Sequence, residues 1–463
     1  MPPGIDLRVV GQDQMVPTVD GREVPYANLD NAASTPPLLA VVRKLCAFLP
    51  WYASVHRGAG LKSRLATAVF EEARRRVAAF FGYDPETNVV LFGKNTTEAL
   101  NKLAYRWPWE PGDIVVASLA EHHSNDLPWR RKAALVYLGL REDGAIDLEH
   151  LSWCLAAYAP RVKLVALTGA SNVTGCLTDI HRAAVLAHRH GARIVVDGAQ
   201  LAAHRPLSAL PDDDPGHLDF LAASGHKMYA PFGQGVLIGP RDFFARGDPE
   251  FAGGGTVSGV TLGEVRWAPP PEREEAGTPN TVGAVAMAAA MQVLEEAGLE
   301  TIAAHERALT ARLLERLNGL PGIRLYGPRD PGADRVGIVS FNLEGLPHGL
   351  VAAALACEAG IGVRSGCFCA RPYVQRLLGL SDGEAAAYLR GDLPEPRRPG
   401  MVRVSFGLYN GEEDVDRLVE AIGRIIDRPQ YYRTNYVFDR EDGYWWPQGW
   451  RMDYRKYFSL DVP

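Results

Sequence analysis

Between about residues 60 and 290, short apolar runs alternate with amphipathic stretches. Runs such as "DIVVAS", "KLVALTG", "ARIVVDGA" and "LDFLAAS" contain few polar positions, as expected of strands that are buried on both faces of a parallel sheet. The stretch "TDIHRAAVLAHRHG" instead repeats apolar residues at helical spacing and ends at Gly191, a common helix stop. This alternation predicts an α/β domain whose mostly parallel sheet is covered by helices.

Two further helices are predicted in the same region. In "LKSRLATAVFEEARRRVAAFFG" the spacing predicts one apolar face, with Gly82 ending the helix. That face consists of Leu65, Val69, Ala73, Val77 and Phe80. The β-rich run "NVVLFG" leads into "KNTTEALNKLA", a helix for which Asn95 or Thr96 is a natural cap.

After about residue 295 the pattern changes to a long helix, Leu299 to Leu317, and separate strands at "RVGIVSFNL" and "MVRVSFGLYN". This predicts a smaller α+β domain after the large one. We therefore divide the chain into an N-terminal segment that packs with the small domain (1–25), a large domain (26–294), the small domain (295–430) and an aromatic-rich tail (431–463).

Two segments stand apart within this division. Residues 380–402 form a polar excursion inside the small domain. The tail contains "YYRTNYVFDR" and "YWWPQGW", and because aromatic patches usually mark interfaces, we expect it to dock on the body or on a second subunit rather than to bind a ligand.

Composition narrows the class of protein. The chain has 463 residues and a formal net charge of −6, which argues against a general nucleic-acid binder or a protein of anionic membranes. The start lacks a basic region followed by an apolar run, and the apolar stretch from Val282 to Met291 is too short to span a bilayer.

Six cysteines show neither a disulfide framework nor a zinc-binding pattern. We expect a cytoplasmic enzyme without a metal.

Polar residues follow the predicted strands, at the edge where α/β sheets bind ligands. Asp197 ends "RIVVD", Gln200 follows one short turn later, and Lys227 lies in "SGHKMYAPFG" directly after "LDFLAAS". A lone strand-end aspartate is more simply a helix cap. Together, however, the amine and the carboxylate suit pyridoxal phosphate, whose aldehyde bonds a lysine and whose ring nitrogen pairs with an acid.

A phosphate group would need donors at a helix start. Thr96 and Thr97 open the helix after "NVVLFG", and Ser224 and His226 flank Lys227 and could complete the site. His122, after "DIVVAS", could lie over an aromatic cofactor ring. Each of these residues, taken singly, also has an ordinary structural explanation.

Ten blocks in matching order, over roughly residues 26 to 425, carry a family resemblance. The sequence resembles class V, fold-type I pyridoxal phosphate enzymes, above all cysteine desulfurases and selenocysteine lyases. The blocks are "NLDNAAST", "SVHRGAG", "NTTEALN", "EHHSNDLPW", "GASNVTG", "VDGAQ", "SGHKMYAPFGQGVL", "EAGTPNT", "VRSGCFCA" and "VRVSFGLYN".

The resemblance implies a role for each candidate residue. Lys227 would bind the cofactor covalently, Asp197 would hold its pyridine nitrogen, and His122 would stack on the ring and handle protons. Gln200 and Asn172 would contact the phenolic oxygen and the substrate side. Thr97, Ser224 and His226 would bind the phosphate. Thr278 would reach the phosphate site of a neighbouring subunit, which requires a homodimer.

The resemblance also implies the reaction. Arg403 matches the arginine that holds the substrate carboxylate, and Arg364 lies near it. Cys369 falls at the nucleophile position, where a thiolate takes the sulfur of L-cysteine, leaves L-alanine and becomes a persulfide for transfer to an acceptor protein. This chemistry requires an accessible thiol with a lowered pKa, to which Arg364 could contribute.

The cysteine loop departs from the common family pattern at Cys367 and Phe368. Its "GCFC" form looks more like the desulfurase-like domain of molybdenum cofactor sulfurases. Cys367 could relay the persulfide or form a disulfide with Cys369. A class V C–S lyase, epimerase or aminotransferase would need Lys227, Asp197 and Arg403 but not Cys369, and a non-catalytic interaction protein would need none of them. The sequence leaves open the acceptor and the choice between cysteine, selenocysteine and a larger thioether amino acid.

Overall fold

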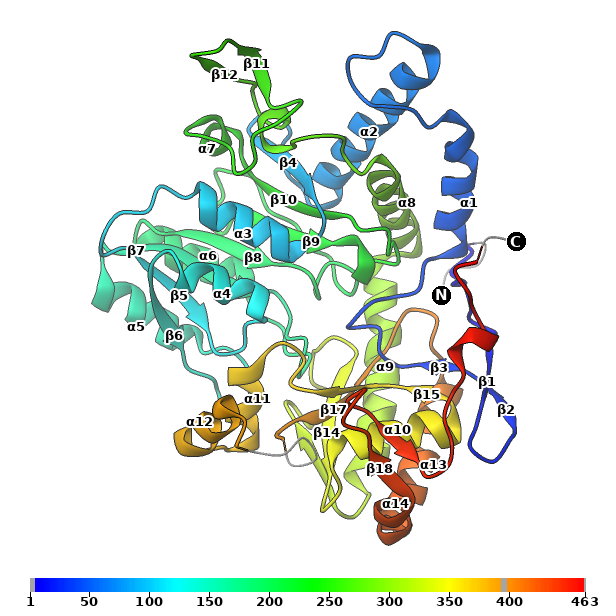
Figure 1. Ribbon diagram of the computed structural model, residues 1–463. Coiled ribbons are helices and arrows are strands. Elements are labelled where there is room, and N and C mark those ends of the chain that lie inside the picture. Colours follow the sequence, from blue (N-terminus) through cyan, green and yellow to red (C-terminus); the bar gives the residue numbers. More distant parts are fainter. Residues whose placement is uncertain (1–4, 393–397, 462–463) are drawn as a thin grey trace.

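The computed structural model describes residues 5–392 and 398–461, which form two parts, each around its own sheet (Figure 1). The larger sheet has the strand order β4-β10-β9-β8-β7-β5-β6. Its strands are β4 (Asn88–Gly93), β5 (Ile114–Ser118), β6 (Ala134–Leu138), β7 (Val162–Thr168), β8 (Arg193–Asp197), β9 (Phe220–Ser224) and β10 (Gly235–Pro240). Strands β5 to β9 run parallel, whereas β10 is antiparallel to both β9 and β4. The predicted mostly parallel mixed sheet is confirmed.

Both faces of this sheet are covered, which explains why its central strands are almost wholly apolar. In β8, Ile194 and Val196 pack into a core with α1, α2, α5, α6 and α8, whereas Val195 packs into a second core with α3. Successive side chains of a strand point to opposite faces, so each face needs its own layer of helices. These helices are α1 (Leu39–Phe48), α2 (Leu61–Phe80), α3 (Thr96–Arg106), α4 (Leu127–Arg130), α5 (Leu148–Tyr158), α6 (Ile180–Arg189), α7 (Arg241–Ala245) and α8 (Thr281–Ala297).

The predicted buried face of α2 is partly wrong. Ala73 and Val77 are buried as expected, but Leu65, Val69 and Phe80 are only partly buried. The stripe runs instead through Ala66 and Phe70. From Ala66 through Phe70 and Ala73 to Val77 the steps are four, three and four residues, so these side chains share the face that α2 turns toward the core it shares with α8.

The second part is a four-stranded antiparallel sheet with the order β13-β14-β17-β16. Helices α9, α10 and α13 pack on it around a separate apolar core. The elements are α9 (Leu299–Asn318), β13 (Ile323–Tyr326), β14 (Ile338–Leu343), α10 (His348–Ala359), β16 (Arg364–Gly366), β17 (Met401–Ser405) and α13 (Glu412–Asp427). This is the α+β arrangement predicted after residue 295.

The N-terminal residues contact both parts. Strands β1 (Met15–Pro17) and β2 (Glu23–Pro25) form a hairpin, and the Val19 N–H donates to Cys357 O of the small part. A backbone bridge also joins Val9 to Leu38 of the large part. The boundary at residue 25 stays a prediction.

The tail docks on its own small part. Helix α14 (Pro429–Asn435) leads into the antiparallel pair β18 (Tyr436–Phe438) and β19 (Trp445–Pro447). The hydroxyls of Tyr432 and Tyr436 both donate to the carboxylate of Glu358 on α10. The predicted excursion, residues 380–402, begins after α11 (Arg371–Leu378) and contains α12 (Asp382–Arg390), and residues 393–397 lie outside the described part of the chain.

A hairpin of β11 (Val257–Val260) and β12 (Val265–Trp267) projects from the large part (Figure 1). Its Val260, Leu262 and Val265 are exposed. Among the described helices, none alone is long and apolar enough to cross a membrane, and α8 with α9 pass that test only as a pair bent by 76°.

Candidate active site

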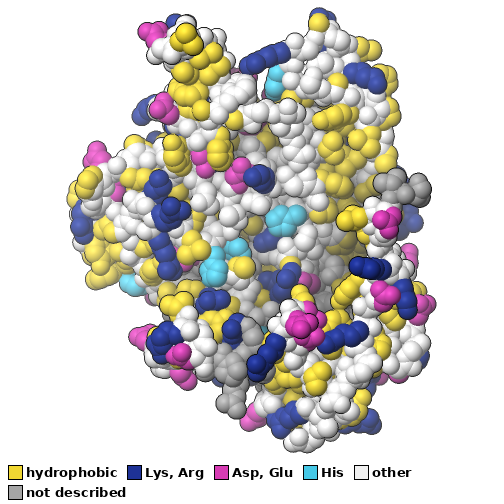
Figure 2. Space-filling model, in the orientation of Figure 1, with side chains coloured by type: hydrophobic (Ala, Val, Ile, Leu, Met, Phe, Trp, Pro, Cys, Tyr) yellow, Lys and Arg dark blue, Asp and Glu magenta, His cyan; other side chains and the backbone are white. Residues whose placement is uncertain are grey.

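A cavity of about 340 Å³ lies at the carboxyl ends of β7, β8 and β9, where the large part meets the small one. This is the edge at which open α/β sheets bind ligands. Figure 2 shows histidine and basic side chains gathered around a hollow near the middle of this face.

Lys227 and Asp197 enter the cavity from neighbouring parallel strands. Asp197 is the last residue of β8, and Lys227 ends the 3₁₀ turn η3 (Gly225–Lys227) that directly follows β9. Burial lowers the pKa of Lys227 to about 8, although the charge of Asp197 opposes this shift. Burial raises the pKa of Asp197, while the Ala199 N–H, 2.9 Å from its Oδ1, opposes that shift. The amine is therefore much closer to neutrality at physiological pH than an exposed lysine, as a nucleophilic amine requires.

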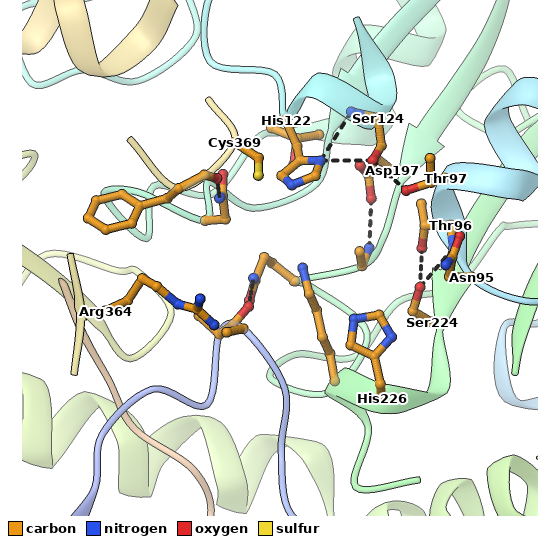
Figure 3. A pocket seen from close by; sticks show the side chains of 18 of the residues that line it. Asn95, Thr96, Thr97, His122, Ser124, Asp197, Ser224, His226, Arg364 and Cys369 are labelled. Carbon is orange, nitrogen blue, oxygen red and sulfur yellow. Dashed lines mark hydrogen bonds between the residues drawn. The ribbon is translucent and has the colours of Figure 1, made fainter. Parts of the chain in front are cut away.

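His122 lines the same cavity as Lys227 and directly precedes the turn η2 (His123–Asn125). Its Nδ1 accepts from the Ser124 N–H at 3.1 Å and lies 2.9 Å from the Ser124 hydroxyl. That hydroxyl is also 2.6 Å from the hydroxyl of Thr97 (Figure 3). Burial, followed by the charge of Lys227, lowers the pKa of His122 to about 3. His122 is therefore a neutral imidazole, and because Nδ1 accepts, its proton is on Nε2.

A buried carboxylic acid, Glu121, precedes this histidine and bonds residues on either side of it. Glu121 Oε1 accepts from the Ser118 hydroxyl at 2.5 Å, and Oε2 accepts from Asn125 Nδ2 at 2.6 Å. Burial raises the pKa of Glu121 to about 8. The side chain is therefore a neutral acid at pH 7, and it braces the loop that carries His122.

We expect Glu121→Gln to stabilise the protein at pH 8 and to change little near pH 4.5. The folded-state pKa is raised, so the stability that the neutral acid provides is lost as pH rises from about 4.5 through 8; glutamine does not ionise. The gain at pH 8 should be on the order of 2 to 4 kcal/mol, measured by urea unfolding of the apo-protein. An exposed glutamate, Glu23→Gln, is the control, and an equal gain there or none at Glu121 would contradict the assignment.

The start of α3 forms a site for an anion. The Thr96 N–H donates to Ser224 Oγ at 2.8 Å, and the two hydroxyls are 2.7 Å apart (Figure 3). Asn95, not Thr96, caps the helix. A Cβ on Gly235 would lie 2.4 Å from Asn95 Cα, so β10 can pass this close only with glycine. His226 lines the same end of the cavity, and burial lowers its pKa to about 4. Free backbone N–H groups at a helix start favour a phosphate.

The small part contributes an arginine pair held by one carboxylate. Arg403, buried in β17, donates to Asp30 Oδ1 at 3.0 Å and to Asn172 O at 2.9 Å. Arg364 Nε lies 3.0 Å from the other oxygen of Asp30. Burial lowers the pKa of Arg403 to about 10, and its Nε has no hydrogen-bond partner among the described residues. The guanidinium therefore keeps donor capacity for a carboxylate ligand.

The cysteine loop is a tight turn. The Ala370 N–H donates to Cys367 O at 2.9 Å, and the two residues between them, Phe368 and Cys369, have φ of +52° and +54°. Two successive positive φ values are typical of a type I′ turn, which normally prefers glycine or asparagine. Each non-glycine residue in this conformation costs roughly 1–2 kcal/mol, so surrounding contacts must hold the turn.

Those contacts come from the predicted site itself. Asn172 Nδ2 donates to Phe368 O at 2.7 Å, and the His123 N–H donates to Cys369 O at 2.7 Å. The guanidinium of Arg403 lies 4.8 Å from the centre of the Phe368 ring. The loop is thereby fixed at two successive carbonyls, with the Cys369 side chain beside His122 in the cavity (Figure 3).

The two cysteines of this loop differ in access. Cys369 is exposed and lines the cavity, whereas Cys367 is half-buried and its thiol donates to Pro399 O at 3.2 Å. Burial raises the pKa of Cys367, with Arg371 opposing. All six cysteines are free thiols, so the relay and disulfide hypotheses for Cys367 stay predictions.

All the predicted site residues except Thr278 line this cavity. They are Thr96, Thr97, His122, Asn172, Asp197, Gln200, Ser224, His226, Lys227, Arg364, Cys369 and Arg403. Thr278 is exposed, between the end of β12 and the start of α8, and its role toward a neighbouring subunit stays a prediction. Sequence reasoning missed Asp30, Glu121, His123 and Ser124, although each lies in or beside a block that carried the family resemblance.

Away from this cavity, His188, His217 and Asp219 gather near the end of α6. His188 Nε2 lies 2.8 Å from Asp219 Oδ2, and this contact raises the pKa of His188. A hydrogen-bonded histidine–aspartate pair explains the cluster without a metal ion, and the expected absence of a metal stays a prediction.

Comparison with known proteins gives the family. Residues 27–418 match the family model of class-V aminotransferases. This chain belongs to that family. It is 36% identical to a cysteine desulfurase of Haloferax volcanii, over 90% of this chain and 93% of the relative. It is 35% identical to a probable cysteine desulfurase of Synechocystis, over 87% of this chain and 91% of the relative. The family resemblance predicted from the ten blocks is confirmed.

Solved structures agree with the predicted fold. A cysteine desulfurase of Thermococcus onnurineus is 34% identical, with a TM-score of 0.77 over 87% of this chain and 95% of that one. An Escherichia coli cysteine desulfurase is 31% identical, with a TM-score of 0.73 over 87% and 95%. The tail, from residue 431, lies beyond the part that the class-V family model matches.

Proposed function

We propose that this protein is a pyridoxal phosphate-dependent cysteine desulfurase, which converts L-cysteine to L-alanine and leaves a persulfide on Cys369. The observation that carries the proposal is that Cys369 lines the same cavity as Lys227 and Asp197. Negative charge on the Cys369 sulfur would oppose the lowering, caused mainly by burial, of the pKa of Lys227 and of Arg403, so this sulfur lies close to both cations. A nucleophile among these groups is what desulfuration needs beyond the shared cofactor chemistry.

The residues in the cavity fit pyridoxal phosphate. Lys227 would bond its aldehyde, and Asp197 would pair with its pyridine nitrogen. The start of α3, with Thr96 and Ser224, would bind its phosphate. Gln200 Oε1 is buried without a partner among the described residues, which indicates a polar ligand in the wall it faces. When bound, the cofactor supplies an aldehyde and an electron-withdrawing ring.

The chain's own residues would hold the amino acid and move its protons. Arg403 would bind the substrate carboxylate through its remaining donors. The Lys227 amine, whose pKa is about 8, is suited to take a proton from the α-carbon and to return one. His122 presents Nε2–H on the side away from Ser124 (Figure 3) and would orient the reacting groups as a neutral donor.

Sulfur transfer would then occur at the cysteine loop. The Cys369 thiolate attacks the sulfur of the substrate, a new S–S bond forms, and the substrate C–S bond breaks. The electron pair of that bond stays with the substrate carbon, which takes up a proton and leaves as alanine. The exposed, fixed position of Cys369 suits this step, since the thiol must meet both the substrate and an acceptor.

The test is to supply the holoenzyme with L-cysteine and a reductant and to identify the products. Alanine and sulfide in equal amounts would support the proposal. Pyruvate and ammonia with the sulfide would instead assign β-elimination, as expected of a C–S lyase.

We further expect the rate of covalent pyridoxal phosphate binding to rise with pH around a midpoint near 8. Only the neutral amine attacks the aldehyde, and the pKa of Lys227 is about 8. The rate of appearance of the yellow absorbance band, measured between pH 6 and 10, reports this midpoint. Because Asp197 raises the pKa of Lys227, Asp197→Asn should move the midpoint down. A midpoint above 10 would contradict the burial argument.

The exposed apolar hairpin supports a homodimer. The side chains of Val260, Leu262 and Val265 project into solvent in one chain, and such patches usually meet a partner. Thr278 would then lie near the neighbouring cavity. The molar mass measured by sedimentation should be twice that of the chain, and Leu262→Asp should shift this mass toward that of one chain. A sulfur acceptor, either a protein or a small thiol, and a cytoplasmic location also belong to this proposal.

A further inference from the structure

A second cavity, of about 860 Å³, opens beside the candidate active site and shares Arg364, Phe368 and Cys369 with it. One wall includes the cysteine loop and the face of α10 that carries His348, Ala352 and Ala356, and the other is the C-terminal tail. We call this cavity the tail groove. The tail contributes Phe438, Tyr444, Trp445, Trp446, Trp450 and Tyr454.

The tail wall is a folded surface. The Trp446 indole donates to Asp442 Oδ2 at 2.7 Å, the Arg451 guanidinium lies 4.8 Å from the centre of the Trp446 ring, and the Trp445 and Phe438 rings are 5.7 Å apart. The matched family region ends at residue 418. The aromatic wall therefore lies outside the region that matches the family model, and it lines the same groove as the candidate nucleophile.

The groove is also cationic. Arg364 and Arg371 line it, and Asp30 is the one carboxylate among its described lining residues. Asp30 is already bonded to Arg364 and to Arg403. Arg371 Nε is buried without a hydrogen-bond partner among the described residues. A groove that combines arginines with flat aromatic side chains is complementary to an anion that carries a planar ring.

We propose that the tail groove binds the sulfur acceptor, and that this acceptor is a small thiol bearing an aromatic ring and a carboxylate or similar anion. The inference rests on the proposed desulfurase function. The size supports a small molecule, since ligand pockets typically enclose about 300–1,000 Å³, whereas protein partners need broad surfaces. Cys369 lines both cavities, so it receives sulfur on one side and delivers it on the other.

The transfer step balances without a further reactant. The acceptor thiolate attacks the outer sulfur of the Cys369 persulfide, forming a new S–S bond on the acceptor. The enzyme S–S bond breaks, and its electron pair leaves with Cys369 as a thiolate. The acceptor departs as a persulfide, and Cys369 is ready for the next cysteine.

The test compares four alkyl thiols as acceptors for the holoenzyme: 4-(mercaptomethyl)benzoate, benzyl mercaptan, 3-mercaptopropionate and 2-mercaptoethanol. They differ in ring and charge while each keeps an alkyl thiol. Steady-state alanine formation gives kcat/KM for each acceptor. We expect kcat/KM for 4-(mercaptomethyl)benzoate to exceed kcat/KM for 2-mercaptoethanol by about 10-fold or more, equivalent to about 1.4 kcal/mol. The values for benzyl mercaptan and 3-mercaptopropionate should lie between these two.

Matched variants locate the preference. Tyr444→Ala removes an exposed ring of the groove and should lower the preference for the aromatic thiols about 5-fold, and Arg371→Gln should lower the preference for the anionic ones similarly. Tyr457→Ala removes an exposed tail ring that does not line the groove. It should leave the ratios of kcat/KM among the four thiols unchanged. Rates are normalised to the alanine formed in the first turnover without acceptor.

The outcomes separate the two proposals. No first-turnover alanine in the wild type would count against desulfuration itself. First-turnover alanine with equal kcat/KM for all four thiols would overturn the groove assignment alone. So would an unchanged preference in Tyr444→Ala and Arg371→Gln, or an equal loss in Tyr457→Ala.

Discussion

Replacing Cys369 with alanine should reduce the steady-state formation of alanine from L-cysteine at least about 100-fold, because the sulfur loses its acceptor nucleophile. The yellow cofactor band should remain, since Cys369 does not hold any of the groups that fit the phosphate or the ring nitrogen. Alanine also keeps the Cβ, so the turn, with φ of +54° at this position, should be undisturbed. The measurement is alanine release at saturating L-cysteine together with the absorbance spectrum.

Cys367→Ala is the matched control, because this thiol lies in the same turn but is half-buried. It should retain first-turnover alanine formation, and unchanged persulfide transfer would remove the relay hypothesis. Full turnover by Cys369→Ala would instead assign the chain to the class V lyases, epimerases or aminotransferases.

Replacing Lys227 with alanine should lower activity at least about 1,000-fold and abolish the covalent cofactor band, because the covalent partner and its proton-transfer role are lost together. Lys227→Arg distinguishes the loss of the positive charge from the loss of the nucleophilic amine. Arginine keeps a cation near Asp197, so the fold should be as stable as wild type, yet a guanidinium cannot act as the neutral amine. A normal yellow band in either variant would refute the assignment of Lys227.

The fold could be predicted where burial imposes a simple pattern. Strands β5, β7, β8 and β9 are covered on both faces, so their sequences are apolar throughout. Strand β6 was missed because it is an edge strand with mostly partly buried residues, and its composition resembles that of a loop. Strand β10 was missed because it follows a turn rich in proline and glycine.

Residues of the candidate site could be predicted where they end a strand or lie in a block that carries the family resemblance. The residues that hold them in place could not be predicted. Asp30 meets Arg403 across 373 positions of chain, and no local pattern predicts such a pair. Ser124 and Glu121 contribute through hydrogen bonds that hold the loop of His122. Such bonds depend on the folded geometry and leave no pattern in the sequence. The positive φ values of Phe368 and Cys369 were equally hidden, since neither residue type favours them.

Asp30 has one consequence for ligand binding. A single carboxylate divides its two oxygens between Arg403, which faces the amino-acid cavity, and Arg364, which faces both cavities. An anion that competes for one guanidinium changes how strongly Asp30 neutralises the other. Occupancy of the two cavities should therefore be linked, and linkage is reciprocal: if the amino acid alters the affinity for the acceptor anion, the acceptor anion must alter the affinity for the amino acid by the same factor.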